Sequence, residues 1–250
     1  MSKIPPKLIT WMIIGMSIIL LEFICYFRFL SPTFLVAPSI ALRNLLYNVI
    51  HGNILSNMAT TFLEVMISSA IACVAGITIG IIFWKWEWLG KIFEPYMAGI
   101  YAVPLIFFYP LLLYVFGLGQ KPIIYIAITN SITPIALNTW IGLKGVRETF
   151  FKVARSVNCS RWQTYLKVVF PAATPRIFAG LKLGFLFAFL SCVAMEFILS
   201  QKGIGWMVKY DYEFFEPGRM YASILLLVIV AVIINSILLH YEKRIRMEME

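Results

Sequence analysis

The stretch KVARSVNCSRWQTYLKVVFPAATP runs from Lys152 to Pro175 and is followed almost at once by the apolar run IFAGLKLGFLFAFLSCVAMEFIL, from Ile177 to Leu199. An apolar run of about 20 residues is long enough to cross the hydrocarbon core of a bilayer as an α-helix. The segment before it is basic and amphipathic instead. A basic segment beside a run of spanning length predicts an integral membrane protein with a structured loop at one membrane face.

The composition of the chain agrees with a lipid environment. Of its 250 residues, 61% are hydrophobic and 13% are charged, and the mean hydropathy is +0.86. Soluble domains carry about 25% charged residues, so this chain lacks the polar side chains to cover its core in water. The net charge is +9. In a membrane protein such an excess is typical of cytoplasmic loops, and we therefore expect lipid rather than nucleic acid as its surroundings.

Six apolar runs predict six transmembrane helices in an all-α integral membrane protein. Their continuous apolar character excludes the short alternating segments of a strand barrel. The third and fourth runs contain prolines, which remove helix hydrogen bonds and are tolerated in lipid only inside a bundle or beside a cavity. We expect one domain over residues 1–250, with its core at residues 56–240 and a cytoplasmic loop at residues 144–175. The predicted spans are Leu8–Phe27, Thr61–Phe83, Tyr96–Phe116, Ile123–Leu143, Ile177–Leu199 and Met220–His240.

The positions of Lys and Arg predict the orientation. With the N-terminus inside the cell, the inner segments hold fifteen of the 21 cations and the outer segments hold six. Because cytoplasmic loops carry the excess of Lys and Arg, both termini are expected in the cytoplasm. The long outer segment between Arg28 and Asn57 is expected to contain a short interfacial helix.

The basic segment itself predicts a helix, a tight turn and a second helix. Asn158 favours the left-handed conformation that ends a helix, and Ser160 with Gln163 forms the pattern of a capping box. Pro171 and Pro175 are expected to end the second helix before the fifth span. The expected apolar stripes are Val146, Phe150, Val153, Ala154 and Val157 on the first helix, and Trp162, Tyr165, Leu166 and Val169 on the second.

Two functions suit such a segment. Two amphipathic cationic helices can lie on anionic lipid headgroups. A capped turn on two short helices can instead insert into a groove of another protein. The residues alone leave both alternatives open.

The segment resembles the cytoplasmic loop of permease subunits of binding-protein-dependent ABC importers. That loop reads Glu-Ala-Ala, three residues, Gly, nine residues, an apolar residue, any residue, Leu, Pro. Here the same spacing gives Lys152-Val153-Ala154, then Asn158, then Val168-Val169-Phe170-Pro171. Lys152 stands in place of the acid, Val153 in place of the first alanine and Asn158 in place of the glycine. Asn is the best non-glycine residue for a positive φ.

Further stretches between about residues 56 and 208 are similar to the branch of this family that imports nitrate, sulfonates, taurine and thiamine precursors. They are Pro104 to Pro110 followed by Phe116-Gly117-Leu118-Gly119, Pro134 followed by Leu137-Asn138-Thr139 and Gly142-Leu143-Lys144-Gly145-Val146, Ser160-Arg161-Trp162-Gln163, Pro171-Ala172-Ala173 with Pro175, and Ala194-Met195-Glu196 followed by Gly203-Ile204-Gly205.

The resemblance implies a type I importer permease with a cytoplasmic coupling helix, located in the bacterial cytoplasmic (inner) membrane. It implies a second permease copy, as a homodimer, two ATPase subunits and an extracytoplasmic solute-binding protein as partners. It also implies that ATP and Mg²⁺ are bound by the partner ATPase, since the chain has no phosphate-binding loop of its own, and that the chain is a transport subunit rather than an enzyme, without a cofactor or metal. The implied coupling residues are Lys152, Val153, Ala154, Arg155, Asn158, Ser160, Arg161 and Trp162.

Three polar residues within the spans are candidates for the translocation path. Asn138 and Thr139 can line a path or bond across helices. Glu196 is a functional candidate because of its depth, or it can accept backbone donors near Gly203 and Gly205. Glu64 is expected to be solvated near an interface.

Two other function classes are weighed against an importer permease. A membrane-embedded enzyme would need converging acids, histidines or nucleophiles, which the spans lack. A stand-alone secondary transporter would show two related halves and charges at the midplane, and the sequence shows neither.

Overall fold

The computed structural model describes residues 6–27, 29, 31 and 34–247, and every regular element in that part of the chain is helical, as the sequence predicts. In chain order the elements are α1 (Pro6–Tyr26), α2 (Pro38–His51), α3 (Ile54–Lys85), α4 (Glu87–Ala102), the 3₁₀ helix η1 (Leu105–Phe108), α5 (Tyr109–Phe116), α6 (Gln120–Lys144), α7 (Glu148–Ser156), α8 (Arg161–Thr164), the π-helical turn η2 (Tyr165–Val169), α9 (Phe170–Leu199), α10 (Ile204–Glu213) and α11 (Pro217–Met247).

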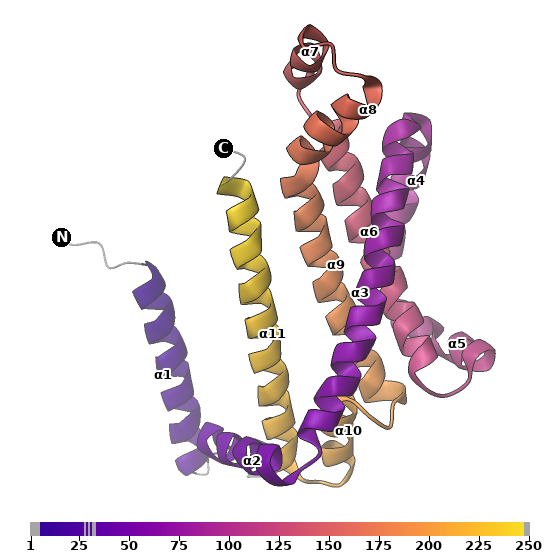
Figure 1. Cartoon of the computed structure of the whole chain (residues 1–250). Coiled ribbons are helices and arrows are strands. Elements are labelled where there is room, and N and C mark those ends of the chain that lie inside the picture. The colour runs from indigo at the N-terminus through magenta and orange to yellow at the C-terminus, as the bar shows by residue number, and fades with distance from the viewer. Residues whose placement is uncertain (1–5, 28, 30, 32–33, 248–250) are drawn as a thin grey trace, which may run out of the picture.

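The long helices stand roughly side by side, with α7 and α8 beyond one end of the bundle and α2, α5 and α10 at the other (Figure 1). Helix α1 begins and α11 ends at the same end as α7 and α8. Among the described residues, three helical stretches are long and apolar enough to cross a membrane: Ile54–Lys85, Arg161–Glu213 and Pro217–Ile245. The first, fourth and fifth expected runs fall largely or wholly within α1, α6 and α9.

The centre of the fold is the packing of α6 between α3 and α9. Small residues allow this close approach. A Cβ added at Gly80 of α3 would lie 2.6 Å from Cβ of Thr139, and one at Gly184 of α9 would lie 2.5 Å from Ile135. Because lipid is as apolar as the side chains, helices in a bilayer associate through such close van der Waals packing.

The prolines of the third and fourth runs have different effects. Val103 and Pro104 have extended backbone between α4 and η1, so the third run is not one helix. Pro110 lies in the first turn of α5, where its missing N–H costs nothing. Pro134, in contrast, lies inside α6, which continues from Gln120 to Lys144. Proline therefore breaks the third run and leaves the fourth as a continuous helix.

The expectation that Pro171 and Pro175 end the second short helix is wrong. Helix α8 passes through η2 directly into α9, and both prolines lie within the continuous helical path. The N–H of Phe170 bonds to the carbonyl of Tyr165, five residues earlier. This π-type bond shifts the hydrogen-bond register, and Pro171, which has no N–H to donate, lies directly after it.

Candidate functional site

The elbow, defined here as residues 148–169, is built from α7, a tight turn, α8 and η2. Asn158 has φ of +53° and reverses the chain after α7. The Ser160 hydroxyl accepts the N–H of Gln163 at 3.2 Å, and the Ser160 N–H donates to the Gln163 side chain at 2.9 Å. Both bonds of the predicted capping box are thus present, and they fix the start of α8.

The elbow exposes apolar side chains at its tip. The exposed fractions of Val153, Val157 and Trp162 are 58%, 65% and 70%, whereas Ala154 on the same helix is buried. Of the apolar stripe predicted on α7, only Ala154 is fully covered within the chain. Three apolar side chains on a capped, rigid turn make a surface suited to contact with another molecule.

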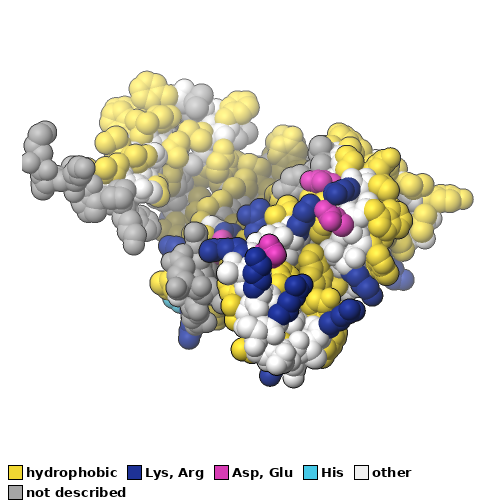
Figure 2. Space-filling model, turned by 90° about the horizontal axis from the view of Figure 1, so that it is seen from above, with side chains coloured by type: hydrophobic (Ala, Val, Ile, Leu, Met, Phe, Trp, Pro, Cys, Tyr) yellow, Lys and Arg dark blue, Asp and Glu magenta, His cyan; other side chains and the backbone are white. Residues whose placement is uncertain are grey.

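The charges around this tip are predominantly positive. Lys152 forms an exposed ion pair with Glu148, one helical turn earlier, at 3.6 Å, while Arg155 and Arg161 are exposed. Figure 2 views this end of the molecule and shows Lys and Arg side chains spread over it, with only a few acidic ones. The predicted coupling residues thus lie together on one projecting, basic end of the fold.

A second charged cluster ties α4 to α6 near the same end. Glu87 contacts Lys144 and Lys91, each at 3.2 Å. The hydrogen bond from Lys144, followed by that from Lys91, holds the pKa of the Glu87 carboxyl below its usual value. Because all three side chains are exposed, this cluster orients helix ends and adds little stability.

Asn138 and Thr139 lie in helix-packing positions. The Asn138 amide donates to the carbonyl of Pro134 at 2.8 Å, and its Cβ faces Gly180 of α9. Thr139 is fully buried against Gly80 of α3. Both residues therefore occupy the close contacts of α6 with its two neighbours.

Glu196 is buried at the centre of a hydrogen-bond network between α3, α9 and α10. This network, called the latch below, consists of Asn57, Thr61, Glu196 and the backbone N–H groups of residues 203–205. Its Oε1 accepts the hydroxyl of Thr61 at 2.7 Å, and its Oε2 accepts the N–H of Gly205 at 2.9 Å. The Thr61 oxygen in turn accepts the N–H of Ile204 at 2.9 Å. Gly203, with φ of +101°, donates its N–H to Asn57 at 2.9 Å. The latch thus binds three consecutive backbone N–H groups at the start of α10.

The expectation that Glu64 is solvated is wrong, because only 1% of the residue is exposed. Glu64 lies on α3, less than one turn from Thr61, and its carboxyl is within electrostatic reach of Glu196. The sequence shows Glu64 among apolar neighbours but does not show which face of α3 turns inward.

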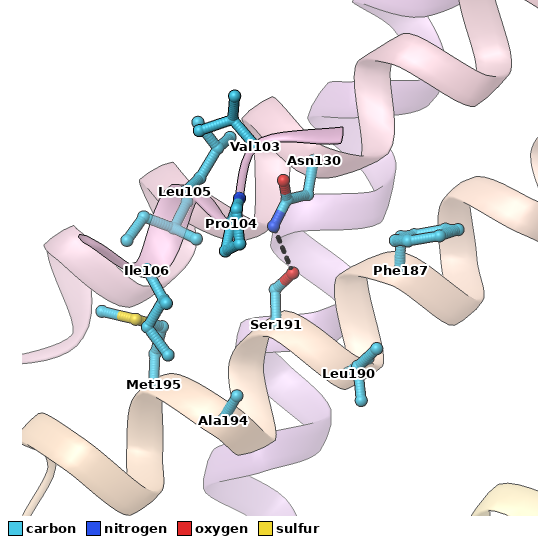
Figure 3. Close-up of a pocket in the computed structure, with 11 residues that line it drawn as sticks. Val103, Pro104, Leu105, Ile106, Asn130, Phe187, Leu190, Ser191, Ala194 and Met195 are labelled. Carbon is cyan, nitrogen blue, oxygen red and sulfur yellow. Dashed lines mark hydrogen bonds between the residues drawn. The ribbon is translucent and has the colours of Figure 1, made fainter. Parts of the chain in front are cut away.

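A cavity of about 250 Å³ lies between the break in the third run and helices α6 and α9 (Figure 3). Its described lining residues are apolar apart from Asn130 of α6 and Ser191 of α9. The Asn130 amide donates to the Ser191 hydroxyl at 2.8 Å across the two helices. Sequence reasoning missed this pair. The available signal was a polar residue in each of two apolar runs. The fourth run also contains Thr129, Ser131, Thr133, Asn138 and Thr139, and no pattern in the sequence selects Asn130 as the partner of Ser191.

Comparison with known proteins shows the family. Residues 72–247 match the family described as binding-protein-dependent transport system inner membrane component. The chain is 27% identical to the taurine transport system permease protein of Escherichia coli over 223 residues, covering 87% of this chain and 81% of the relative. It is 27% identical to a nitrate import permease protein of Leptolyngbya laminosa, covering 72% and 64%, and 24% identical to a putative aliphatic sulfonates transport permease protein of Bacillus subtilis, covering 86% and 78%.

Solved structures share the fold. A chain of the MetNI methionine ABC transporter in an inward-facing conformation superposes with a TM-score of 0.65 at 15% identity, covering 77% of this chain and 95% of that one. A chain of an amino acid ABC transporter superposes with a TM-score of 0.60 at 19% identity, covering 76% and 93%. The chain belongs to the family of binding-protein-dependent transport system inner membrane components and is a multi-pass permease subunit of an ABC importer in the cytoplasmic membrane.

Proposed function

We propose that the elbow is the coupling element through which a separate ATPase subunit moves this permease. The observation that carries the proposal is the exposed apolar group Val153, Val157 and Trp162 on a turn that projects beyond the helix bundle (Figure 1). An elbow adapted to lipid would lie along the membrane surface beside the bundle. A projecting, capped turn offers its apolar side chains to a groove in a partner protein.

The assembly that follows contains two permease copies, two ATPase subunits and an extracytoplasmic binding protein. In this arrangement the chain crosses the membrane six times with both termini and the elbow in the cytoplasm. The side with α2, α5 and α10 then faces the binding protein. ATP and Mg²⁺ belong to the ATPase, and this chain contributes no cofactor and no catalytic group.

The continuous path from α8 through η2 into α9 supports a mechanical role. A displacement of the elbow moves the cytoplasmic end of α9, and α9 packs along α6 and α3. Because the ATPase contacts the elbow differently in its two states, each state favours a different arrangement of the helix bundle. Lys152, Ala154, Arg155, Asn158, Ser160 and Arg161 shape or surround the apolar contact, and Trp162 is its largest member.

We propose a structural role for Glu196, and helix-packing roles for Asn138 and Thr139. Glu196 is surrounded by bonds that fix α10, and the other two fill contacts with glycines. The solute is proposed to be a small molecule with oxyanion oxygens, in keeping with the relatives named for taurine, nitrate and sulfonates.

Co-purification of the partner ATPase tests the docking proposal. The chain is expressed with the ATPase and captured through a tag on the permease. Trp162→Ala and Arg155→Ala are expected to lower the amount of bound ATPase at least about tenfold, since buried Trp and Arg dominate such contacts. The matched control is Tyr114→Ala, an exposed aromatic residue on α5 at the opposite end. Wild-type recovery of the ATPase with Trp162→Ala would refute docking through the elbow.

A further inference from the structure

The break in the third apolar run borders the cavity of Figure 3. Val103 and Pro104 have extended backbone, and η1 follows them with 3₁₀ geometry. Val103, Pro104, Leu105 and Ile106 all line the cavity. Irregular backbone at membrane depth is tolerated only where protein buries it or where it lines a water-filled cavity. A proline-interrupted apolar run is also the sequence feature that points to a solute site in other transporters.

Asn130 and Ser191 give this cavity its polar groups. They lie on different helices, and both side chains reach the cavity wall (Figure 3). Ser191 is 7% exposed and Asn130 is partly buried. The 2.8 Å bond between them uses one amide hydrogen of Asn130. A side-chain amide has a second hydrogen, and the serine hydroxyl has its own hydrogen to donate.

We propose that this cavity is a water-filled station on the translocation path, where Asn130 and Ser191 donate hydrogen bonds to the oxyanion oxygens of the passing solute. The proposal rests on the proposed function, because it needs a solute to pass. The remaining amide hydrogen of Asn130 and the hydroxyl hydrogen of Ser191 are the donors. None of the lining residues that the structure describes is a cation or an acid.

Uncharged hydrogen-bond donors suit a site through which a solute passes. A path must bind its solute well enough for entry and weakly enough for release. A cation in an apolar wall would hold an oxyanion strongly, whereas an amide and a hydroxyl each give a modest net gain. The volume of about 250 Å³ lies just under the usual range of about 300–1,000 Å³ for ligand pockets. A solute of a few heavy atoms fits it.

Cysteine labelling with a charged thiosulfonate tests water access. Asn130→Cys and Ser191→Cys are prepared in membrane vesicles and treated with the anionic, water-soluble reagent 2-sulfonatoethyl methanethiosulfonate. The control is Thr78→Cys on α3, an exposed position whose hydroxyl bonds only to its own helix. Peptide mapping separates each adduct from labelling of the four native cysteines. The two cavity positions are expected to react at least about tenfold faster than position 78. Equal rates would mean that lipid or protein fills the cavity, and would overturn the proposal.

The donor role has its own test. Ser191→Cys is labelled with the same anionic reagent in the presence of Asn130 or of Asn130→Leu, which has nearly the same shape but is uncharged and has no donor. The cationic reagent 2-trimethylammonioethyl methanethiosulfonate serves as the comparison, and all rates are normalised to those with a free thiol. Asn130→Leu is expected to lower the ratio of anionic to cationic labelling about tenfold, the effect of losing one hydrogen bond to a charged group. An unchanged ratio would refute the donor role.

These measurements are independent of the ATPase. Labelling reports on the cavity whether or not a partner is bound, and co-purification reports on the elbow at the other end of α9. Absence of ATPase docking by the unaltered chain together with fast labelling would therefore refute the proposed coupling role of the elbow and support the proposed role of the cavity. Normal docking with slow labelling would do the opposite.

Discussion

The latch around Glu196 can be tested by removing one hydroxyl. Thr61→Val keeps the shape of the side chain but removes the oxygen that bonds Glu196 at 2.7 Å and accepts the N–H of Ile204 at 2.9 Å. Thr61 and Glu196 are both buried. Leaving a buried polar group without its partner costs about 1–3 kcal/mol, and the substitution affects two such groups. The expected loss in the free energy of unfolding is about 2–6 kcal/mol.

A matched control lies next to it. The hydroxyl of Thr60 bonds only to the carbonyl of Ser56 in its own helix, at 3.1 Å. Thermal unfolding of the purified permease in detergent is measured for Thr61→Val and Thr60→Val. At about 2–4 °C per kcal/mol for a chain of this size, Thr61→Val is expected to lower Tm by at least about 4 °C. The control is expected to stay within about 1 °C. Equal Tm values for the two variants would refute the latch.

Three further predictions concern packing, the turn and an ion pair. Gly80→Ala is expected to lower Tm because its new Cβ would lie 2.6 Å from Thr139, whereas Gly99→Ala, with nothing within 4 Å, is expected to leave Tm unchanged; equal effects would contradict the close packing of α3 and α6. Asn158→Val is expected to weaken ATPase co-purification because a β-branched residue is strained at φ of +53°, and Asn158→Gly is expected to preserve it; a normal Val variant would show that the turn does not need this conformation. Lys182→Met and Glu242→Gln are expected to show coupling of about 1–2 kcal/mol in a double-mutant cycle of Tm, since their 2.6 Å pair is largely shielded; additive effects would deny the pair any energetic role.

The sequence predicted the helical class, the family and the local structure of the turn. Those features depend on short-range signals: runs of apolar residues, a positive-φ residue at Asn158, and the Ser160–Gln163 spacing. The capping box formed as predicted because its two bonds join residues three apart. The family resemblance depends on spacing, which survives the replacement of glycine by Asn158.

Features that depend on how the helices are rotated and aligned against one another could not be predicted from such short-range signals. Pro171 and Pro175 often end a helix, but here the helical path continues from η2 into α9, with Pro171 in the first turn of α9 and Pro175 inside that helix. The burial of Glu64 depends on the rotation of α3 about its axis, which turns Asn57, Thr61, Glu64 and Ser68 inward. The bond from Asn130 to Ser191 joins residues 61 positions apart. Its existence follows from how α6 and α9 are aligned, and one residue of sliding would separate the pair.

The π-helical turn at Tyr165–Val169 joins the elbow to α9. Each residue of a regular helix turns the chain by about 100°, and a π-turn holds one residue more than an α-turn in the same stretch. Because the extra residue is taken up in a wider turn, deleting it would restore α-helical hydrogen bonding and leave the direction of the tip nearly unchanged. The surplus backbone unit therefore adds a residue between Trp162 and Pro171 without turning the surface that presents Trp162.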